Sequence, residues 1–97
     1  MKNGPLVSVI IPAYNHNMYI EEALKSVINQ AYDNIELIVI DDGSTDCTPS
    51  IIENYIKNNP DKNIRFIRKE NEGVCKTMNL GLSMAAGEYI AFLASDD

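Results

Sequence analysis

Residues 35–46, Ile-Glu-Leu-Ile-Val-Ile-Asp-Asp-Gly-Ser-Thr-Asp, carry the clearest indication of the fold. The first six residues of this stretch are mostly apolar and β-branched, which is typical of a buried strand. The residues after them are dense in turn formers. The stretch therefore predicts a strand over residues 35–40 that delivers two adjacent carboxylates, Asp41 and Asp42, to its carboxyl end.

Three further segments have the same strand character: residues 6–11, 64–68 and 89–93. The first of them is followed by Pro12, which has no N–H to donate to a sheet, so the strand is expected to end there. The chain therefore holds four predicted strands, separated by longer segments.

Apolar residues recur at helical spacing in the three segments between the strands. They are Ile20, Leu24, Val27 and Ile28 in the first, Ile51, Ile52, Tyr55 and Ile56 in the second, and Val74, Met78, Leu82 and Ala85 in the third. Asn17 is the expected cap of the first helix. Thr48 is the expected cap of the second, with Pro49 as its first helical residue. Gly87 is expected to close the third in the left-handed conformation.

The resulting order, β-α-β-α-β-α-β, predicts an α/β, Rossmann-like domain with a mainly parallel four-stranded sheet flanked by helices. In such sheets, ligands bind beyond the carboxyl ends of the strands. The residues expected at those ends are Tyr14-Asn15, Asp41-Asp42, Lys69-Glu70 and Asp96-Asp97. The candidate functional residues therefore gather at one edge of the predicted sheet.

Length and charge limit the classes of protein that the chain can represent. Its 97 residues suit one domain. Fourteen acidic against eight basic residues, a net charge of −6, argue against a nucleic-acid partner. No apolar run approaches the roughly 18 residues of a membrane helix, and residues 1–7 lack the core of a signal peptide. An acidic protein that handles an anionic substrate would need a cation to bridge the charges.

The two cysteines, Cys47 and Cys75, lie far apart and form no CxxC pair. The lone His16 cannot complete a zinc site with them at any usual spacing. Two buried or half-buried free thiols in a reducing cytoplasm are the prediction.

Several nucleotide-binding and catalytic classes are excluded by missing motifs. No GxGxxG follows the first strand, and no GxxxxGK[ST] or GxSxG occurs. A receiver-like phosphoacceptor domain would place its acidic pair after the first strand and its acceptor aspartate after the third. Tyr14 and Lys69 occupy those positions, which excludes that class.

Each candidate at the sheet edge has a functional and a purely structural interpretation. Asp96 and Asp97 suit a hard divalent cation such as Mg²⁺ or Mn²⁺, or form a solvated acidic chain end. Asp41 and Asp42 accept hydrogen bonds from a base or a ribose, or belong to an acidic turn.

Two other residues leave the same choice open. Tyr14 stacks on a planar base, or is a partly buried surface tyrosine. Lys76, early in the third helix, reaches a phosphate, or is a solvated lysine.

Four segments taken together resemble the family 2 glycosyltransferases. They are Val-Ser-Val-Ile-Ile-Pro-Ala-Tyr-Asn (7–15), Glu-Leu-Ile-Val-Ile-Asp-Asp-Gly-Ser-Thr-Asp (36–46), Asn-Glu-Gly-Val (71–74) with Asn-Leu-Gly-Leu (79–82), and Gly-Glu-Tyr-Ile-Ala-Phe-Leu-Ala-Ser-Asp-Asp (87–97). They occur in the family's order and spacing over nearly the whole chain, and the last resembles the strand that leads into the family's DxD-type metal motif. The ordered set is far more specific than any one segment.

The resemblance implies a GT-A fold and transfer of a sugar from a nucleoside diphosphate to an acceptor, with inversion at the anomeric carbon. Tyr14 would stack on the base, and Asp42 would meet the imide edge of the base. Asp41 would support it or contact the ribose, and Asp96 would approach the ribose or the donor sugar. The nucleotide-binding residues so implied are Pro12, Tyr14, Asn15, Asp41, Asp42, Lys76 and Asp96, and Asp97 is the implied ligand of Mn²⁺ or Mg²⁺.

The chain departs from the family pattern in two ways. Family members often carry a basic residue where this chain has Met78, and Lys76 lies two positions away, on another face of the helix. The family's general base and its acceptor-binding half lie beyond the metal motif. Residues 1–97 are therefore expected to be the N-terminal, nucleotide-sugar-binding portion of a GT-A domain, and to lack turnover alone.

The expected partners follow from the resemblance. They are a nucleoside-diphosphate sugar, with UDP-sugars favoured, and a carbohydrate or lipid-linked acceptor that the absent half would bind. The pathway implied is polysaccharide biosynthesis, in the cytoplasm or at the inner face of the membrane. An uncovered sheet edge predicts homodimerisation or marginal stability of this chain. The alternative function is a non-catalytic nucleotide-binding or interaction module of the same fold.

Overall fold

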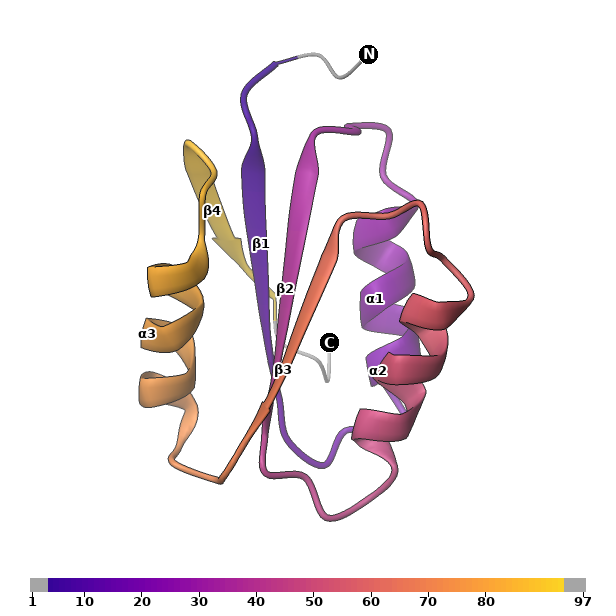
Figure 1. Ribbon diagram of the computed structural model, residues 1–97, viewed down its shortest axis with the longest axis vertical. Coiled ribbons are helices and arrows are strands. Elements are labelled where there is room, and N and C mark those ends of the chain that lie inside the picture. Colours follow the sequence, from indigo (N-terminus) through magenta and orange to yellow (C-terminus); the bar gives the residue numbers. More distant parts are fainter. Residues whose placement is uncertain (1–3, 94–97) are drawn as a thin grey trace.

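The computed structural model describes residues 4–93. Four strands and three helices alternate along the chain (Figure 1), which confirms the predicted order. They are β1 (Val7–Ala13), α1 (Ile20–Ile28), β2 (Ile35–Asp42), α2 (Thr48–Lys57), β3 (Ile64–Lys69), α3 (Val74–Met84) and β4 (Tyr89–Phe92). No helix in this part of the chain has the length and hydrophobicity that a bilayer crossing requires.

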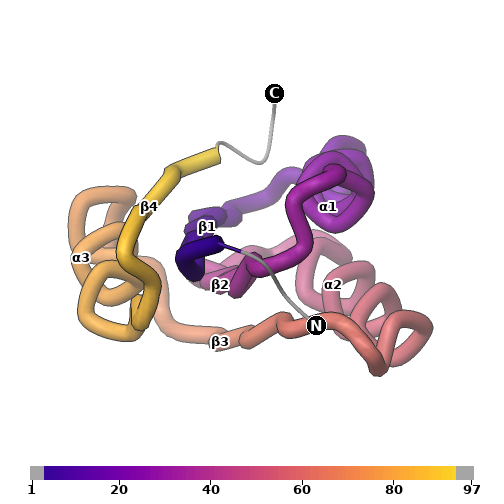
Figure 2. The backbone as a smooth tube through the Cα atoms, turned by 90° about the horizontal axis from the view of Figure 1, so that it is seen from above, coloured from indigo at the N-terminus to yellow at the C-terminus, as the bar shows by residue number. Residues whose placement is uncertain are grey.

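The strands form one sheet in the order β3-β2-β1-β4, and every neighbouring pair is parallel. The chain moves from β1 outward to β3, then returns through α3 to the other side of β1. Helices α1 and α2 consequently cover one face of the sheet and α3 covers the other (Figures 1 and 2). The predicted α/β class and flanking helices are confirmed, and the carboxyl ends beside this reversal are where such sheets bind ligands.

Strand β1 continues through Pro12 to Ala13, so the prediction that Pro12 ends the strand is wrong. The recorded pairing with β4 covers only Val7 to Ile10 of β1. The carbonyl of Ile10 accepts from the amide of Leu93 on that side. Pro12 faces the same side two residues later, beyond the pairing of β1 with β4 within residues 4–93, so its missing N–H interrupts none of that pairing.

Strand β2 also runs further than predicted and includes both aspartates. In register, Asp41 lies opposite Ala13 and Arg68, and Asp42 lies opposite Lys69. Pairing with both neighbours carries β2 through residues whose intrinsic preference is for turns. The same pairing carries β3 one residue beyond the predicted residues 64–68, whereas β4 ends one residue earlier than predicted.

Two predicted helix caps were wrong. The N-cap of α1 is Tyr19, and the side-chain amide of Asn17 instead donates to Cys47 Sγ at 3.3 Å. The N-cap of α2 is Cys47, so Thr48 is already helical. The amide of Thr48 donates to Asp46 Oδ1 at 2.8 Å, which supplies the side-chain acceptor that a helix start needs.

The prediction that Gly87 closes the third helix is also wrong. Helix α3 ends at Met84, and its C-cap Ala85 is extended with φ −68° and ψ 132°. A Cβ on Gly87 would lie 2.7 Å from both the carbonyl oxygen of Leu6 and the amide of Ser8. Gly87 is therefore required for close approach to β1, and not for a left-handed helix end.

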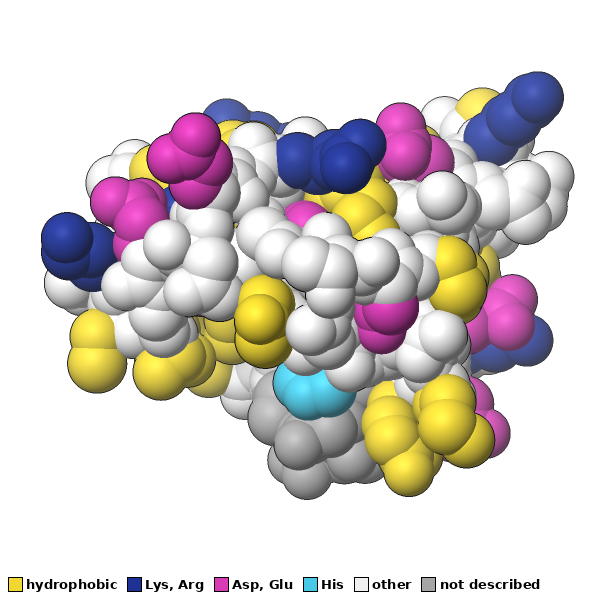
Figure 3. Space-filling view, turned by 90° about the horizontal axis from the view of Figure 1, so that it is seen from below, with side chains coloured by type: hydrophobic (Ala, Val, Ile, Leu, Met, Phe, Trp, Pro, Cys, Tyr) yellow, Lys and Arg dark blue, Asp and Glu magenta, His cyan; other side chains and the backbone are white. Residues whose placement is uncertain are grey.

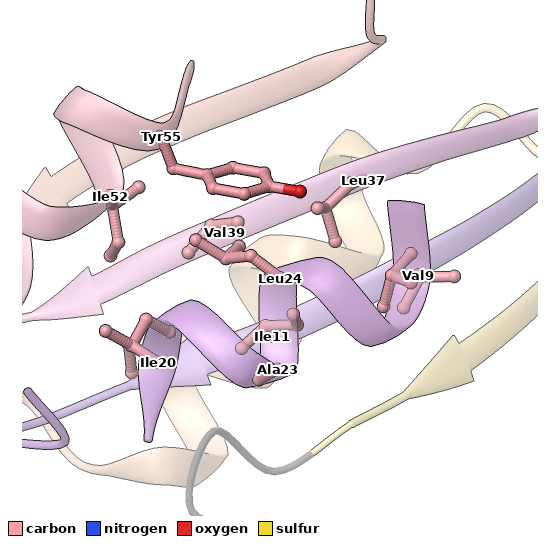
Figure 4. Close-up of a cluster of buried hydrophobic side chains, with 11 residues drawn as sticks. Val9, Ile11, Ile20, Ala23, Leu24, Leu37, Val39, Ile52 and Tyr55 are labelled. Atoms are coloured by element: carbon pink, nitrogen blue, oxygen red, sulfur yellow. The ribbon is translucent and has the colours of Figure 1, made fainter. Parts of the chain in front are cut away.

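The larger core lies between the sheet and the α1–α2 layer (Figure 4). Its buried members are Val9, Ile11, Ala13, Ile20, Ala23, Leu24, Val27, Leu37, Val39, Ile52 and Tyr55. They come from every second residue of β1 and β2 and from the apolar stripes of both helices, as the sequence periods predict.

A smaller core lies on the α3 face, where Ile10, Ile38 and Ile40 pack against partly buried α3 residues. A Cβ on Gly81 would lie 2.5 Å from Ile10 Cγ2, so the absent side chain of Gly81 lets α3 approach the sheet closely.

A buried polar group lies at the other end of the α3 face, toward the amino ends of the strands. The Glu36 carboxylate is 5% exposed and accepts from Ser8 Oγ at 2.7 Å and from the Ala86 amide at 3.0 Å. The Arg65 guanidinium lies 3.4 Å away. Burial would raise the pKa of Glu36, but these hydrogen bonds and the charge of Arg65 outweigh it and hold the pKa below the ordinary value.

Acid is expected to destabilise the protein through Glu36. A carboxylate whose folded pKa lies below its unfolded value stabilises the fold above the unfolded pKa and loses that contribution as the pH falls through the folded pKa. The urea concentration at the midpoint of unfolding is therefore expected to decrease as the pH is lowered below about 5. Glu36→Gln should be less stable at pH 7 and should flatten this acid limb, whereas Glu22→Gln, on the exposed face of α1, should leave both unchanged. An unaltered limb in Glu36→Gln would contradict the assignment.

All four residues of β4 are exposed, including Tyr89, Ile90 and Phe92. On the side away from β1, no strand in the described part of the chain pairs with β4. The predicted uncovered sheet edge is thus present, and dimerisation through it stays a prediction.

Candidate functional site

A pocket of about 230 Å³ lies at the carboxyl ends of the strands. Its lining residues come from the end of β1, the end of β2 and the start of α3: Pro12, Ala13, Tyr14, His16, Asp42, Asn71, Gly73, Val74 and Thr77. Figure 3 views the molecule from this end, where acidic, basic and hydrophobic side chains are interspersed. The fold thus brings together three predicted site residues, Pro12, Tyr14 and Asp42.

Asp42 is the fixed charged group of this pocket, and its side chain is 6% exposed. One carboxylate oxygen accepts from Lys69 Nζ at 2.7 Å and from the Glu72 amide at 2.9 Å. The other accepts from the Gly73 amide at 3.0 Å. Gly73 is the N-cap of α3, so the carboxylate also lies where the positive end of the helix dipole favours an anion.

Burial and hydrogen bonding have opposite effects on Asp42. Burial alone would raise the pKa of this carboxyl group. The hydrogen bonds from Lys69, the amides of Glu72 and Gly73 and the hydroxyl of Thr77 outweigh burial and hold the pKa below the ordinary value. Asp42 is therefore ionised at neutral pH and presents only acceptors.

The segment between β3 and α3 is shaped to reach Asp42. Gly73 has φ 98° and Gly43 has φ 77°, a left-handed conformation that glycine adopts without strain. A Cβ on Gly43 would lie 2.6 Å from the amide nitrogen of Asn71. The Asn71 side chain donates to the Asp42 carbonyl at 3.0 Å, which joins this segment to the end of β2.

Asp41 faces away from this pocket. Side chains alternate along a strand, so Asp41 continues the odd-numbered row of β2, which packs against α1 and α2, and Asp42 continues the even-numbered row on the α3 face. The Asp41 carboxylate accepts from the amide of Ser44 at 3.0 Å and from the Ser44 hydroxyl. The two adjacent carboxylates thus have separate surroundings.

Asn15 joins two loops at the carboxyl edge. It is the non-glycine residue with positive φ in the described chain, at 51°. Its side-chain oxygen accepts from the amides of Thr45 at 2.8 Å and Asp46 at 3.3 Å. Its own amide donates to Ser44 Oγ at 2.9 Å. These contacts hold the segment after β1, which carries Tyr14, against the segment after β2.

The other predicted site residues lie outside the pocket or outside the described chain. Lys76 is exposed in the first turn of α3, and Met78 is half-buried. Asp96 and Asp97 lie outside the described residues. Within residues 4–93, no three His, Cys, Asp or Glu side chains gather as metal ligands would. Of the carboxylates at this edge, Asp41 and Asp42 both accept hydrogen bonds from protein donors.

The cysteines are free, as predicted, but both are exposed, which makes the expectation of burial wrong. Cys47 is the N-cap of α2, and Cys75 lies in the first turn of α3. Both positions lie at the surface, at the start of a helix.

Lys69 and Thr77 are site residues to which the sequence assigned no role. The sequence predicts that Lys69 lies at the end of a strand, but it does not identify Asp42 as the partner of Lys69. The available signal is the register of a parallel sheet, which places Lys69 directly opposite Asp42. Thr77 is a buried polar residue on the sheet-facing side of α3, four positions before Gly81.

Another pocket, of about 220 Å³, lies toward the amino ends of β2 and β3. Its charged residues, Asp33, Asp61 and Lys62, are all exposed. It therefore has no buried charged group fixed by several hydrogen bonds, and the carboxyl-end pocket is the better candidate.

Comparison with known proteins places the chain among glycosyltransferases. It is 48% identical over 96 residues to an uncharacterized glycosyltransferase of Haemophilus influenzae, covering 98% of the chain and 38% of that protein. The mannosyltransferase PcManGT of Pyrobaculum calidifontis, solved with GDP-Man and Mn²⁺, matches with TM-score 0.90 and 34% identity, over 97% of the chain and 28% of its own. TarS of Staphylococcus aureus, residues 1–349 in complex with UDP-GlcNAc, matches with TM-score 0.83 and 37% identity. This match covers 94% of the present chain and 26% of the TarS chain.

These structural matches confirm the Rossmann-like GT-A fold that the resemblance implied. The chain spans less than two fifths of the length of each protein compared. The family model for glycosyl transferase family 2 matches residues 8–97. The chain therefore belongs to glycosyl transferase family 2.

Proposed function

We propose that the carboxyl-end pocket binds the nucleobase of a nucleoside-diphosphate sugar, with UDP-sugars favoured. The observation that carries the proposal is an ionised, buried carboxylate, Asp42, in a pocket that Tyr14 also lines. A carboxylate accepts from a base N–H, and a tyrosine ring stacks on the face of the base. Tyr14 is 43% exposed, which leaves ring surface free for stacking.

We propose roles for the remaining candidates from the same family membership. Asp41 and Asn15 support the pocket by holding the adjoining loops, as their hydrogen bonds indicate. Lys76 contacts the diphosphate from the first turn of α3. Asp96 contacts the ribose or the donor sugar.

Asp97 is the proposed ligand of Mn²⁺ or Mg²⁺, which the neighbour solved with GDP-Man and Mn²⁺ supports. When bound, such a cation supplies positive charge to the diphosphate leaving group. The residues of this chain bind and orient the nucleotide. Asp42 accepts a hydrogen bond from an N–H of the base and leaves the proton on the base.

We propose that the whole protein transfers the sugar to a carbohydrate or lipid-linked acceptor with inversion, in cytoplasmic polysaccharide biosynthesis. Residues 1–97 are then its N-terminal nucleotide-sugar-binding portion. The general base and the acceptor site are proposed to lie in a part that corresponds to the rest of the longer relatives. This chain is therefore expected to bind the donor without turnover.

Calorimetric titration with UDP and GDP, with and without Mn²⁺, tests the proposal. At least one of the two nucleotides is expected to bind and to raise the thermal unfolding midpoint, and Mn²⁺ is expected to strengthen binding. Tyr14→Ala should weaken binding about tenfold, because stacking of a base on an aromatic ring contributes roughly 1–3 kcal/mol.

Tyr89→Ala is the matched control, since Tyr89 is exposed on β4 and absent from the pocket. This variant should bind as the unchanged chain does. No heat and no thermal protection with either nucleotide would overturn the proposed function.

A further inference from the structure

Lys69 is a largely buried cation that contacts two lining residues of the carboxyl-end pocket, Asp42 and Thr77. Its side chain is 13% exposed. Its ammonium group lies 2.7 Å from Asp42 Oδ1 and 3.0 Å from Glu72 Oε1. It also donates to the carbonyl of Glu70 at 3.0 Å and to Thr77 Oγ1 at 3.3 Å. These contacts fix Lys69 between the ends of β2 and β3 and the start of α3.

The protein groups that contact the Asp42 carboxylate all act as donors: Lys69 Nζ, the amides of Glu72 and Gly73 and the hydroxyl of Thr77. A protonated carboxyl group would place its O–H against one of these donors or into the pocket. The ammonium charge of Lys69 opposes that state, because it lies within direct contact of the carboxylate and is shielded from water.

We propose that Lys69 is the positioning residue that keeps Asp42 an obligatory hydrogen-bond acceptor, and that it thereby selects nucleobases that offer a ring N–H, such as uracil or guanine. Bases that offer a ring-nitrogen lone pair, such as cytosine or adenine, then meet acceptor against acceptor. This inference rests on the proposed function and adds to it the residue that sets the choice of base.

Other titratable groups near Asp42 are weaker candidates for this role. Glu72 adds negative charge on the far side of Lys69, and its side chain is 49% exposed. Tyr14 and His16 line the same pocket from the segment after β1. Lys69 Nζ lies 2.7 Å from Asp42 Oδ1 and is largely buried, so removing it should change the protonation of Asp42 most.

UDP and CDP form the sharpest pair of probes. They share the ribose and the diphosphate and differ at the base edge, where uracil offers N3–H beside the O4 acceptor and cytosine offers the N3 lone pair beside the N4 amino group. A site that accepts a hydrogen bond from a ligand N–H strongly rejects an analogue without that N–H, because buried polar groups are left unpaired. The unchanged chain should therefore bind UDP at least about tenfold more tightly than CDP at pH 7.5.

Lys69→Met removes the charge and keeps much of the length of the side chain. The variant is expected to bind UDP at least about tenfold more weakly, and its preference for UDP over CDP should fall to about threefold or less, most clearly at pH 5.5. Lys62→Met is the matched control, since Lys62 is exposed just before β3, at the other end of the sheet. It should keep the full preference. The pH series is repeated in a His16→Gln background, because His16 lines the same pocket.

Equal weakening of UDP and CDP in Lys69→Met, or an unchanged preference, would show a merely structural role and overturn the inference. Circular dichroism establishes whether Lys69→Met folds. If it does not, ¹³C NMR of the Asp42 carboxyl carbon in the unchanged chain decides: no titration between pH 5 and 8 supports the inference, and titration within that range overturns it. If the unchanged chain binds no nucleotide, the proposed function fails and the inference fails with it.

Discussion

Asp42→Asn is expected to lower the free energy of unfolding by about 3 kcal/mol, because removing one partner of a buried ion pair leaves the other charge uncompensated. Lys69 would keep only its contact with Glu72 among charged groups. The new amide also has one acceptor oxygen where the carboxylate had two. Its NH₂ group must therefore face a protein donor or the pocket.

The same substitution is expected to weaken UDP binding about a hundredfold, since a hydrogen bond to a charged group contributes roughly 1.5–3 kcal/mol and the amide would also present a donor to the base N–H. Urea unfolding and calorimetric titration measure the two effects separately. Asp33→Asn, an exposed aspartate before β2 at the opposite end of the sheet, is the control and should change neither. Wild-type stability in Asp42→Asn would contradict the geometry of the site, and wild-type affinity would contradict the proposed base contact.

Leu24→Ala is expected to lower the free energy of unfolding by about 3 kcal/mol, within the range of roughly 2–5 kcal/mol for such truncations in a core. Leu24 has no exposed surface and lies in the larger core between α1 and the sheet (Figure 4). The loss combines the transfer free energy of the removed atoms with the cavity that they leave. A 97-residue chain buries a small core, so this is a large fraction of its stability.

Leu82→Ala is the control for this prediction. This substitution makes the same chemical change on α3, but Leu82 is 42% exposed. The free energy of unfolding is therefore expected to fall by less than about 1 kcal/mol. Chemical denaturation of both variants at one pH compares them directly. Equal losses in the two would mean that the core does not lie where the structure places it.

The elements were predictable because their signals are local. The apolar runs of the strands and the stripe of Ile20, Leu24 and Val27 in α1 follow the two periods of side-chain direction, and these periods survive without tertiary contacts. The ends were less predictable. Pro12 and Asp41 have preferences that argue against a strand, and pairing in the sheet outweighs them. Gly87 is typical of a helix end, and close approach to β1 explains it instead.

The carboxyl-end location of the site was predictable for a similar reason. Parallel strands separated by helices place all their carboxyl ends at one edge, whatever the details of packing. Tyr14 and Asp42 were therefore expected at this edge, and both line the candidate pocket there. The roles of the surrounding side chains were not predictable, because Asn15 and Lys69 take partners about 30 residues away along the chain.

Residue patterns were enough to predict the order of strands and helices, the faces that α1 and α2 bury and the edge of the sheet where the candidate residues gather. They mispredicted the buried face of α3, because Val74 and Leu82 of its predicted stripe are 57% and 42% exposed. Thr77 and Gly81 are buried there instead.

The folded chain was needed to show that Asp41 and Asp42 face opposite sides of the sheet, and that Lys69 and the start of α3 hold the Asp42 carboxylate ionised. The periods of side-chain direction in strands and helices depend on residues that are neighbours in the sequence. The charge state of a buried group depends instead on the distances to donors that strand register and helix packing bring from elsewhere in the chain.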